Sequence, residues 1–288
     1  PESIRDNLNI GEISQQELAK SLSHLKPEER ELAMQYIKQE LRFVNPRAMD
    51  KMIDQVYGDL IKKAKAQGID PNKIYFYVPA PKPSAKRNGT FTRHSPKIIA
   101  NALAQKYNIP ADRFIFPGFF EGTKQTRTQI RELRNNGDLK MLAYIDDFNG
   151  SGATTEQVHQ QMRAAGKNIP IFLGSLVTGG SGQKATKSLQ QADQSFTKQE
   201  HTSTIISTAT TIAPLQDTAF YKNLSPYQQA LFGKIVGEGG IFSNKEDGGY
   251  GLVFFYSSPN NDNKLISEHI APLFGLGDQA TRVDRTRR

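Results

Sequence analysis

The spacing of the apolar positions changes once along the chain. In the first part, apolar residues such as Ala33, Ile37 and Leu41 recur every three or four positions, which is the spacing of one helix face. Pro46 interrupts this pattern, because proline has no amide proton for the helix interior. We therefore predict a helical N-terminal unit over residues 1–68, with a break between two helices at Pro46.

Beyond residue 68, short β-branched and aromatic runs alternate with stretches at helical spacing. The short runs predict strands over 73–78, 113–116, 141–145, 169–177 and 203–209. The other stretches predict helices over 95–106, 155–165 and 183–192. Strands that alternate with helices form a parallel sheet, because right-handed crossovers return the chain in the same direction. We predict an α/β domain over residues 69–288, with a parallel sheet flanked by helices.

Composition excludes several kinds of site. The chain has 288 residues and no cysteine, which excludes disulfides, thiolate nucleophiles and cysteine-based zinc sites. The five histidines show no close paired spacing, so we expect no dedicated zinc centre. No run of about 18 apolar residues occurs, so we expect no membrane contact and a cytoplasmic protein. The net charge of +8 favours nucleotides, diphosphates or nucleic acid as partners, without choosing among them.

The strongest chemical signal follows the predicted strand at 141–145, where Asp146 and Asp147 precede a loop of glycines and hydroxyl residues. Two carboxylates at a strand end can accept hydrogen bonds from a vicinal diol or hold a hydrated Mg²⁺. Glycines let the backbone approach an anion, and the free amides of a helix start can bind phosphate. The residues expected to bind the phosphate are Asn149, Gly150, Ser151, Gly152, Ala153, Thr154 and Thr155.

Other interpretations of this segment stay open. An aspartate pair at a strand end also occurs in receiver domains and in hydrolases that form an aspartyl phosphate, but those proteins need further acids and a later lysine. Another type of phosphate site, or a solvated turn, remains an alternative. The glycine-rich segment at 179–182 is interpreted as a plain connection, because no lysine and hydroxyl follow it at the spacing of a P-loop.

Residues 142–154 resemble the phosphoribosyl-diphosphate signature of type I phosphoribosyltransferases, in which apolar residues, two acids, a short gap and Thr-Gly-x-Thr follow one another. Ser151 replaces the usual threonine and keeps its hydroxyl, and Ala153 stands where many members have glycine. The resemblance implies a phosphoribosyltransferase-like fold that binds phosphoribosyl diphosphate or a nucleotide with Mg²⁺. It also implies that Asp146 and Asp147 are catalytic residues that orient the ribose hydroxyls and the metal.

The same resemblance implies roles for two more loops. The loop after the first strand would bind pyrophosphate, although its three prolines are unlike the common pattern. Its candidate residues are Ala80, Lys82, Ser84 and Lys86. Residues 121–134 would form the mobile catalytic loop of the family, with Lys124, Arg127 and Arg131 as candidate anion clamps. Lys124 and Arg127 would be the catalytic cations over the pyrophosphate.

The C-terminal part carries a second resemblance. A predicted strand at 250–256, followed by the segments 257–261 and 270–274, looks like the ending of a phosphoribosyltransferase-like family of bacterial conflict and antiphage loci, including some retrons. That resemblance implies a defence effector, with nucleic acid or a reverse transcriptase complex as partner. A homo-oligomer is a separate hypothesis, which the sequence does not decide. The alternatives are a nucleotide- or nucleic-acid-binding module without turnover, and a hydrolase of phosphoribosyl diphosphate or of a nucleotide.

Overall fold

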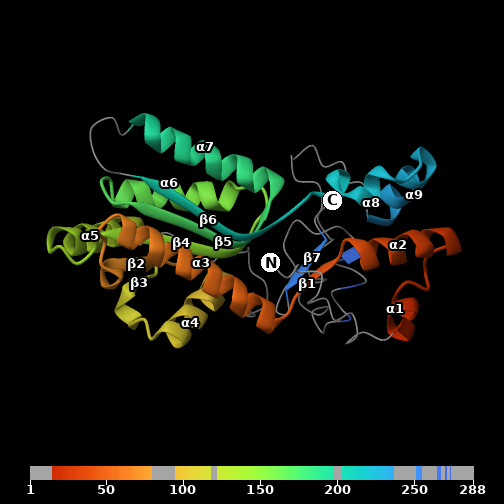
Figure 1. The fold of residues 1–288 in the computed structure, drawn as a ribbon, viewed down its shortest axis with the longest axis horizontal. Coiled ribbons are helices and arrows are strands. Elements are labelled where there is room, and N and C mark those ends of the chain that lie inside the picture. Colours follow the sequence, from red (N-terminus) through yellow and green to blue (C-terminus); the bar gives the residue numbers. More distant parts are fainter. Residues whose placement is uncertain are drawn as a thin grey trace. The chain divides into compact units, whose positions relative to one another are not determined.

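The computed structural model describes residues 15–79, 95–117, 122–196, 203–236 and 251–254, together with Leu265, Ile266, Ile270 and Leu273. The chain forms two compact units (Figure 1). The first contains residues 1–50 and 212–288, and the second contains residues 51–211. The boundary expected after residue 68 lies inside the second unit, just beyond helix α3 (Pro46–Ala66). That boundary marks a change of sequence pattern, whereas the two units are defined by compactness.

A five-stranded sheet forms the centre of the second unit, with the strand order β3-β2-β4-β5-β6. Its strands are β2 (Ile74–Tyr77), β3 (Phe114–Ile115), β4 (Met141–Asn149), β5 (Ile171–Gly179) and β6 (Thr204–Ile212). Strand β2 is parallel to β3 and β4, and β4 is parallel to β5. The predicted α/β class, with a parallel sheet flanked by helices, is confirmed.

Helices cover both faces of this sheet (Figure 1). The helices on one face are α5 (Gly122–Asn135), α6 (Ala153–Ala165) and α7 (Gly180–Phe196). Their side chains Ile130, Val158 and Met162 pack with Tyr144 and Leu173 of the sheet in one core cluster. The other face carries α4 (Ser95–Tyr107) and the part of α3 from residue 51. Short 3₁₀ helices at Pro71–Lys73 and Ala111–Arg113 lead into β2 and β3.

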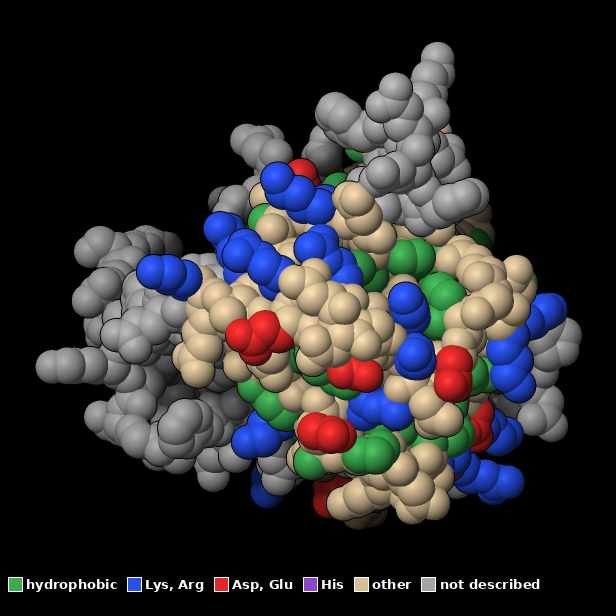
Figure 2. All heavy atoms as spheres, turned by 90° about the vertical axis from the view of Figure 1, so that its left-hand side faces the viewer, with side chains coloured by type: hydrophobic (Ala, Val, Ile, Leu, Met, Phe, Trp, Pro, Cys, Tyr) green, Lys and Arg blue, Asp and Glu red, His purple; other side chains and the backbone are tan. Residues whose placement is uncertain are grey.

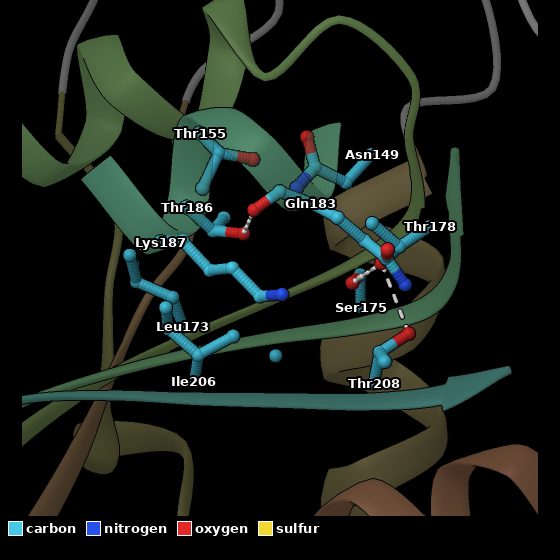
Figure 3. Close-up of a pocket in the computed structure, with 11 residues that line it drawn as sticks. Asn149, Thr155, Leu173, Ser175, Thr178, Gln183, Thr186, Lys187, Ile206 and Thr208 are labelled. Atoms are coloured by element: carbon cyan, nitrogen blue, oxygen red, sulfur yellow. Dashed lines mark hydrogen bonds between the residues drawn. The ribbon is translucent and has the colours of Figure 1, made fainter. Parts of the chain in front are cut away.

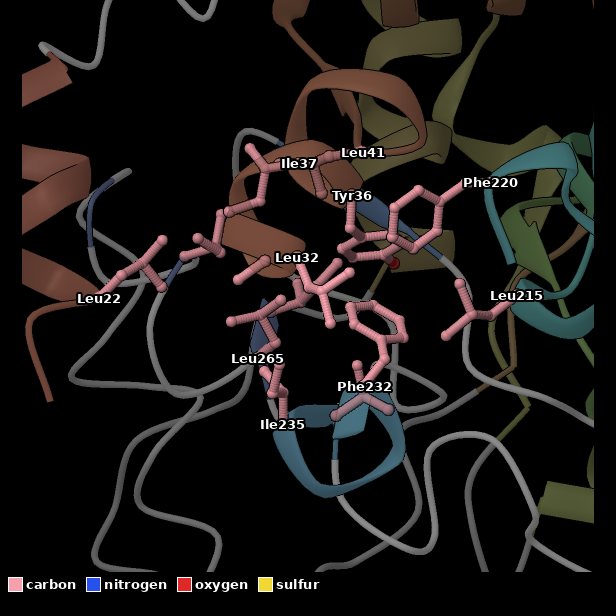
Figure 4. Close-up of a cluster of buried hydrophobic side chains, with 14 of the residues drawn as sticks. Leu22, Leu32, Tyr36, Ile37, Leu41, Leu215, Phe220, Phe232, Ile235 and Leu265 are labelled. Atoms are coloured by element: carbon pink, nitrogen blue, oxygen red, sulfur yellow. The ribbon is translucent and has the colours of Figure 1, made fainter. Parts of the chain in front are cut away.

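The first unit packs helices around a separate core. Its helices are α1 (Gln15–Ser21), α2 (Pro27–Gln39), α8 (Ala219–Lys222) and α9 (Pro226–Val236), with a 3₁₀ turn at Leu215–Asp217. Figure 4 shows the centre of this core, where Tyr36 contacts Phe220 and Phe232 with tilted and edge-on rings. The predicted break before α3 is confirmed. Asn45 caps the new helix by accepting a hydrogen bond from the Ala48 amide at 2.8 Å.

The N-terminal segment was predicted to be helical, but its described part also contains a strand. Strand β1 (Arg42–Val44) lies between α2 and α3, and it pairs in parallel with β7 (Leu252–Phe254). The prediction missed β1 because three residues are too few to show a period, and because its partner lies at the far end of the chain. The described part of the strand expected at 250–256 therefore pairs outside the central sheet. No helix in the described ranges has the length and apolar character needed to cross a membrane.

Candidate functional site

The order of the strands selects one place on the edge of the central sheet. From β2 the chain first moves outward to β3 and then returns to add β4 on the other side of β2. In sheets of this order, ligands bind in the crevice at the carboxyl ends of the strands where the direction of winding reverses. Here that place lies between the ends of β2 and β4. The loop after β4 consists of residues 150–152, which are part of the predicted phosphate site.

The two aspartates lie inside β4, and not in a loop after it as the sequence predicted. The strand continues beside β5 as far as Asn149, with Asp146 opposite Ser175 and Asn149 opposite Thr178. Asp146 and Asp147 are only 7% and 8% exposed. Successive side chains of a strand point to opposite faces, so the two carboxylates do not lie side by side. Their roles as catalytic residues stay predictions.

Asp146 accepts hydrogen bonds from within its own strand. The Tyr144 hydroxyl donates to Asp146 Oδ2 at 2.5 Å, and the Asp147 amide donates to Oδ1 at 2.9 Å. Burial raises the pKa of Tyr144 well above its usual range, and the neighbouring carboxylate of Asp146 raises it further. The Tyr144 hydroxyl therefore stays protonated and is the donor of the hydrogen bond to Asp146.

The two carboxylates are the contacts predicted for a hydrated Mg²⁺. Among the described residues, no group of three or more histidine, aspartate or glutamate side chains could hold a metal ion. Mg²⁺ is commonly held by only one or two carboxylates together with substrate phosphates. The expected Mg²⁺ therefore stays a prediction.

The structure brings the predicted phosphate residues together at the start of α6. Gly152 is the N-cap residue with φ of 88°, a left-handed conformation that glycine adopts without steric cost. It provides no side-chain cap, and the Ala153 amide donates to Ser151 Oγ at 3.3 Å. The start of a helix attracts anions, because its first amides have no partner inside the helix and the dipole is positive there. A phosphate could therefore bind to the first turn of α6.

Helix α7 packs directly against this loop. The segment 179–182, expected to be a plain connection, instead ends β5 and begins α7 without a turn. A Cβ atom on Gly182 would lie 2.1 Å from the carbonyl oxygen of Asn149, and one on Gly152 would lie 2.2 Å from Cβ of Ala185. Only glycine at both positions permits this approach. The segment therefore serves the packing of α7 onto the loop.

A cavity of about 140 Å³ adjoins the loop between β5, β6, α6 and α7 (Figure 3). It is lined by Asn149, Thr155, Leu173, Gly174, Ser175, Thr178, Gln183, Thr186, Lys187, Ile206 and Thr208. Two of these residues, Asn149 and Thr155, belong to the predicted phosphate site. Figure 3 shows the Lys187 side chain reaching across the cavity, with its ammonium group toward the middle. Lys187 was not among the residues predicted for the site. The one available signal was that the predicted phosphate loop itself contains no cation.

A chain of hydroxyls crosses the floor of the cavity. Thr208 Oγ1 donates to the carbonyl oxygen of Thr210 at 2.9 Å. Because a hydroxyl has one proton, Thr178 must donate to Thr208 at 2.9 Å, and Ser175 must donate to Thr178 at 2.5 Å. Ser175 therefore offers lone pairs to the cavity, while Lys187 offers donors. The cavity suits a polar group that accepts from Lys187 and donates to Ser175.

The segment expected to be the mobile catalytic loop is a helix. Residues 122–135 form α5, in which Thr126 and Ile130 are buried and Lys124 and Arg127 are exposed. The loop prediction was wrong because the many polar residues concealed the helical spacing of the few buried ones. Arg127 of this helix influences Tyr77, the last residue of β2. Burial raises the pKa of Tyr77 to about 12, and the positive charge of Arg127 opposes that rise. Arg127 therefore lies near the end of β2.

The catalytic roles of Lys124 and Arg127 stay predictions. Both side chains are exposed on α5, which follows the short strand β3. The candidate pyrophosphate residues Ala80, Lys82, Ser84 and Lys86 lie outside the described residues. The structure therefore describes the sugar-phosphate half of the predicted site and one of its two flanking segments.

Comparisons with known proteins give little more. No protein-family model matches the chain, and no curated protein matches it. Among solved structures, the chain is similar to the Helicobacter pylori xanthine-guanine-hypoxanthine phosphoribosyltransferase at 9% identity and a TM-score of 0.31, over 59% of this chain and 88% of that one. It is also similar to the AQ2163 protein from Aquifex aeolicus at 9% identity and a TM-score of 0.35, over 72% of this chain and 95% of that one. TM-scores this low do not establish a common fold.

Proposed function

We propose that the second unit binds a ribose 5-phosphate compound, such as phosphoribosyl diphosphate or a nucleoside 5′-phosphate, through residues 149–155. One observation carries this proposal: a glycine loop that opens a helix lies where the winding of a parallel sheet reverses. The phosphate would accept hydrogen bonds from the first amides of α6 and from the hydroxyls of Ser151 and Thr154. The ribose hydroxyls would then lie toward the end of β4.

The cavity provides a cation beside the predicted phosphate loop, on the side of β4 that faces β5. A bound phosphate needs positive charge nearby, and the segment 149–155 contains none. Lys187 provides an ammonium group in a cavity that Asn149 and Thr155 also line. Among the described residues, no carboxylate pairs with Lys187, so its charge is available to a ligand. Lys187 would neutralise the phosphate from the side of α7.

The finer proposal is a phosphoribosyltransferase-like enzyme. In such a transfer, the bond from the anomeric carbon of the ribose to the diphosphate breaks, and a new bond to an acceptor forms. The protein would hold the sugar and stabilise the departing charge. Asp146 and Asp147 would orient the ribose, and Lys124 and Arg127 would contact the diphosphate.

A second candidate function is binding without turnover. Two observations favour it: the carboxylate of Asp146 is already an acceptor inside the fold, and the expected catalytic lid is a helix. A helix whose side chains are packed in the core does not close over a diphosphate as a mobile loop does. A role as a defence effector also stays a prediction, because the segment 257–261 of the second resemblance lies outside the described residues.

Isothermal titration of the full chain tests the binding proposal. Phosphoribosyl diphosphate, ribose 5-phosphate and adenosine 5′-phosphate should bind. The double substitution Ser151→Ala and Thr154→Ala should weaken binding about 30-fold, since two lost hydrogen bonds at about 1 kcal/mol each are worth about 2 kcal/mol. Thr128→Ala with Ser188→Ala is the matched control. Those two exposed hydroxyls bond to carbonyl oxygens of their own helices and lie outside the loop.

The outcome decides between the candidates. Failure of the folded wild-type protein to bind any of the three compounds at millimolar concentration refutes the proposed site. Binding with release of pyrophosphate in the presence of a base or nucleic acid acceptor favours the transferase. In that case Lys124→Ala with Arg127→Ala should slow the release more than it weakens binding. Binding without release, unchanged in that double variant, favours the second candidate.

A further inference from the structure

Four basic side chains form a stripe along α5. Lys124, Arg127, Arg131 and Arg134 follow one another at intervals of three, four and three residues. At about 100° per residue, these intervals place them within an arc of roughly 80° on the helix surface. All four side chains are exposed. With a rise of about 1.5 Å per residue, the basic stripe is about 15 Å long.

The position of the stripe is fixed by the packing of α5. Thr126 and Ile130 are buried and Leu133 is half-buried, so this side of the helix faces the sheet layer. Glu132 is the one acid of α5, and its position lies about 120° away from the middle of the stripe. Figure 2 shows the side of the molecule where α5 ends, on which Lys and Arg side chains gather among fewer acids.

The positive charge of the stripe is not neutralised within the described part of the chain. No carboxylate there pairs with any of the four side chains. Like charges three or four residues apart on a helix repel each other and destabilise it by a few tenths of a kcal/mol per pair. Three such pairs in succession therefore weaken α5. A polyanion laid along the helix would remove this repulsion.

We infer that the basic stripe of α5 binds the sugar-phosphate backbone of a nucleic acid strand. Phosphates of such a strand recur at short, regular intervals, as the four cations do, and they release counterions when cations replace them. Three of the four cations are arginines, and one planar guanidinium group can donate hydrogen bonds to two oxygens of the same phosphate. Lys124 and Arg127 are also the cations proposed to contact a diphosphate. The part of the test that is independent of the proposed function therefore rests on Arg131 and Arg134, which lie about 2.5 and 3.3 helical turns beyond the start of α5.

Binding of fluorescent oligouridine to the full chain, measured by anisotropy over a range of salt concentrations, tests the inference. Arg131→Gln with Arg134→Gln should weaken binding and lower the salt slope by about 1.4, and the quadruple Gln variant should lower it by about 3. The matched control replaces Lys20, Lys38, Lys97 and Lys184 by Gln. These exposed lysines lie elsewhere, and the control loses the same four charges.

The control separates a defined surface from net charge alone. The expected result is a loss of affinity of at least about tenfold at moderate salt in the quadruple stripe variant, with a much smaller loss in the control. Equal losses in both variants, or no binding at low salt, would overturn the inference. Vesicles of anionic lipid serve as a further competitor. If vesicles bind through the stripe and oligouridine does not, the partner is a membrane surface and the inference is wrong.

Discussion

Asp146 shows how a residue of a recognisable motif can also serve the fold. Its carboxylate is buried and accepts from the Tyr144 hydroxyl and the Asp147 amide. A buried charge is tolerated only where donors compensate for the water it loses. The buried carboxylate of Asp146 therefore contributes to the fold as well as to the predicted site.

Replacement of Tyr144 by phenylalanine tests this structural role. The substitution removes one donor from a buried carboxylate and should lower the free energy of unfolding by about 1 to 3 kcal/mol. Urea unfolding at neutral pH would measure the change. Tyr227→Phe is the control, because Tyr227 is 67% exposed and should show almost no effect. Equal stability of the two variants would mean that the Tyr144 hydroxyl does not stabilise Asp146.

The sequence predicted some residues of the site and missed others for a physical reason. Asp146 and Gly152 are close in sequence, so their common position follows from one local pattern. Ser175, Lys187 and Thr208 come from β5, α7 and β6, and only the folded sheet brings them to one cavity. Hydroxyl residues inside otherwise apolar strands were the one available signal.

Among the elements, α7 and the loop after β4 are packed so closely that neither can move without the other. Gly182 allows the first turn of α7 to touch the Asn149 carbonyl oxygen, and Thr186 on the next turn donates to the Gly182 carbonyl oxygen at 2.8 Å. Asn149 Nδ2 also donates weakly to the Gly182 carbonyl oxygen, at 3.4 Å. The position of the helix therefore determines the shape of the loop and of the cavity beside it.

The substitution Gly182→Ala should disturb both the loop after β4 and the cavity beside it. Its new methyl group would meet backbone atoms, so α7 or the loop must move, and the protein should lose stability and bind ribose 5-phosphate compounds less tightly. Gly58→Ala is the control, because nothing lies within 4 Å of a Cβ atom there. That exposed change in helix α3 should instead stabilise the protein by about 0.5 to 1 kcal/mol. Thermal unfolding would compare the stability of the two variants, and titration with ribose 5-phosphate would compare their binding. Unchanged binding in Gly182→Ala would show that the shape of the loop does not depend on the position of α7.

Most elements of the central sheet follow from the sequence, because four of its five strands have four to nine residues and flanking helices, which leave clear periods. The errors occur where the local signal is poor. In α5 the apolar residues are too few to reveal a helix, and in β4 the polar residues after Ile145 concealed the continuation of the strand. Pairing with the nine-residue strand β5 extends β4, which a local pattern does not show.

At the scale of the whole molecule, stability should depend on alkaline pH through buried tyrosines. Burial raises the pKa of Tyr144 well above its usual range and that of Tyr77 to about 12. An unfolded tyrosine loses its proton near pH 10, while these two keep theirs in the folded state. Above about pH 10 the unfolded state therefore binds fewer protons than the folded state. The contribution of the two tyrosines to the free energy of unfolding is fully present below about pH 10, and it is lost as the pH rises through their pKa values in the folded state.

Urea unfolding midpoints between neutral pH and pH 11 would measure this dependence. Tyr77→Phe and Tyr144→Phe should each show a smaller decline above about pH 10 than the wild-type protein, because each removes one titrating group. Titration of lysines affects all variants alike and cancels in the comparison. A decline as steep in both variants as in the wild type would contradict the assignment to these tyrosines.

The parallel pair of β1 and β7 has a consequence for the order in which the chain can fold during synthesis. The ribosome completes residues 51–211 before it reaches Leu252, so the second unit has its whole sequence while β1 still lacks a partner strand. Nascent chains generally fold their N-terminal domain first. Here we expect that order to be reversed: residues 1–50 lack the partner strand of β1 until residues 252–254 emerge, whereas the whole of residues 51–211 is already synthesised.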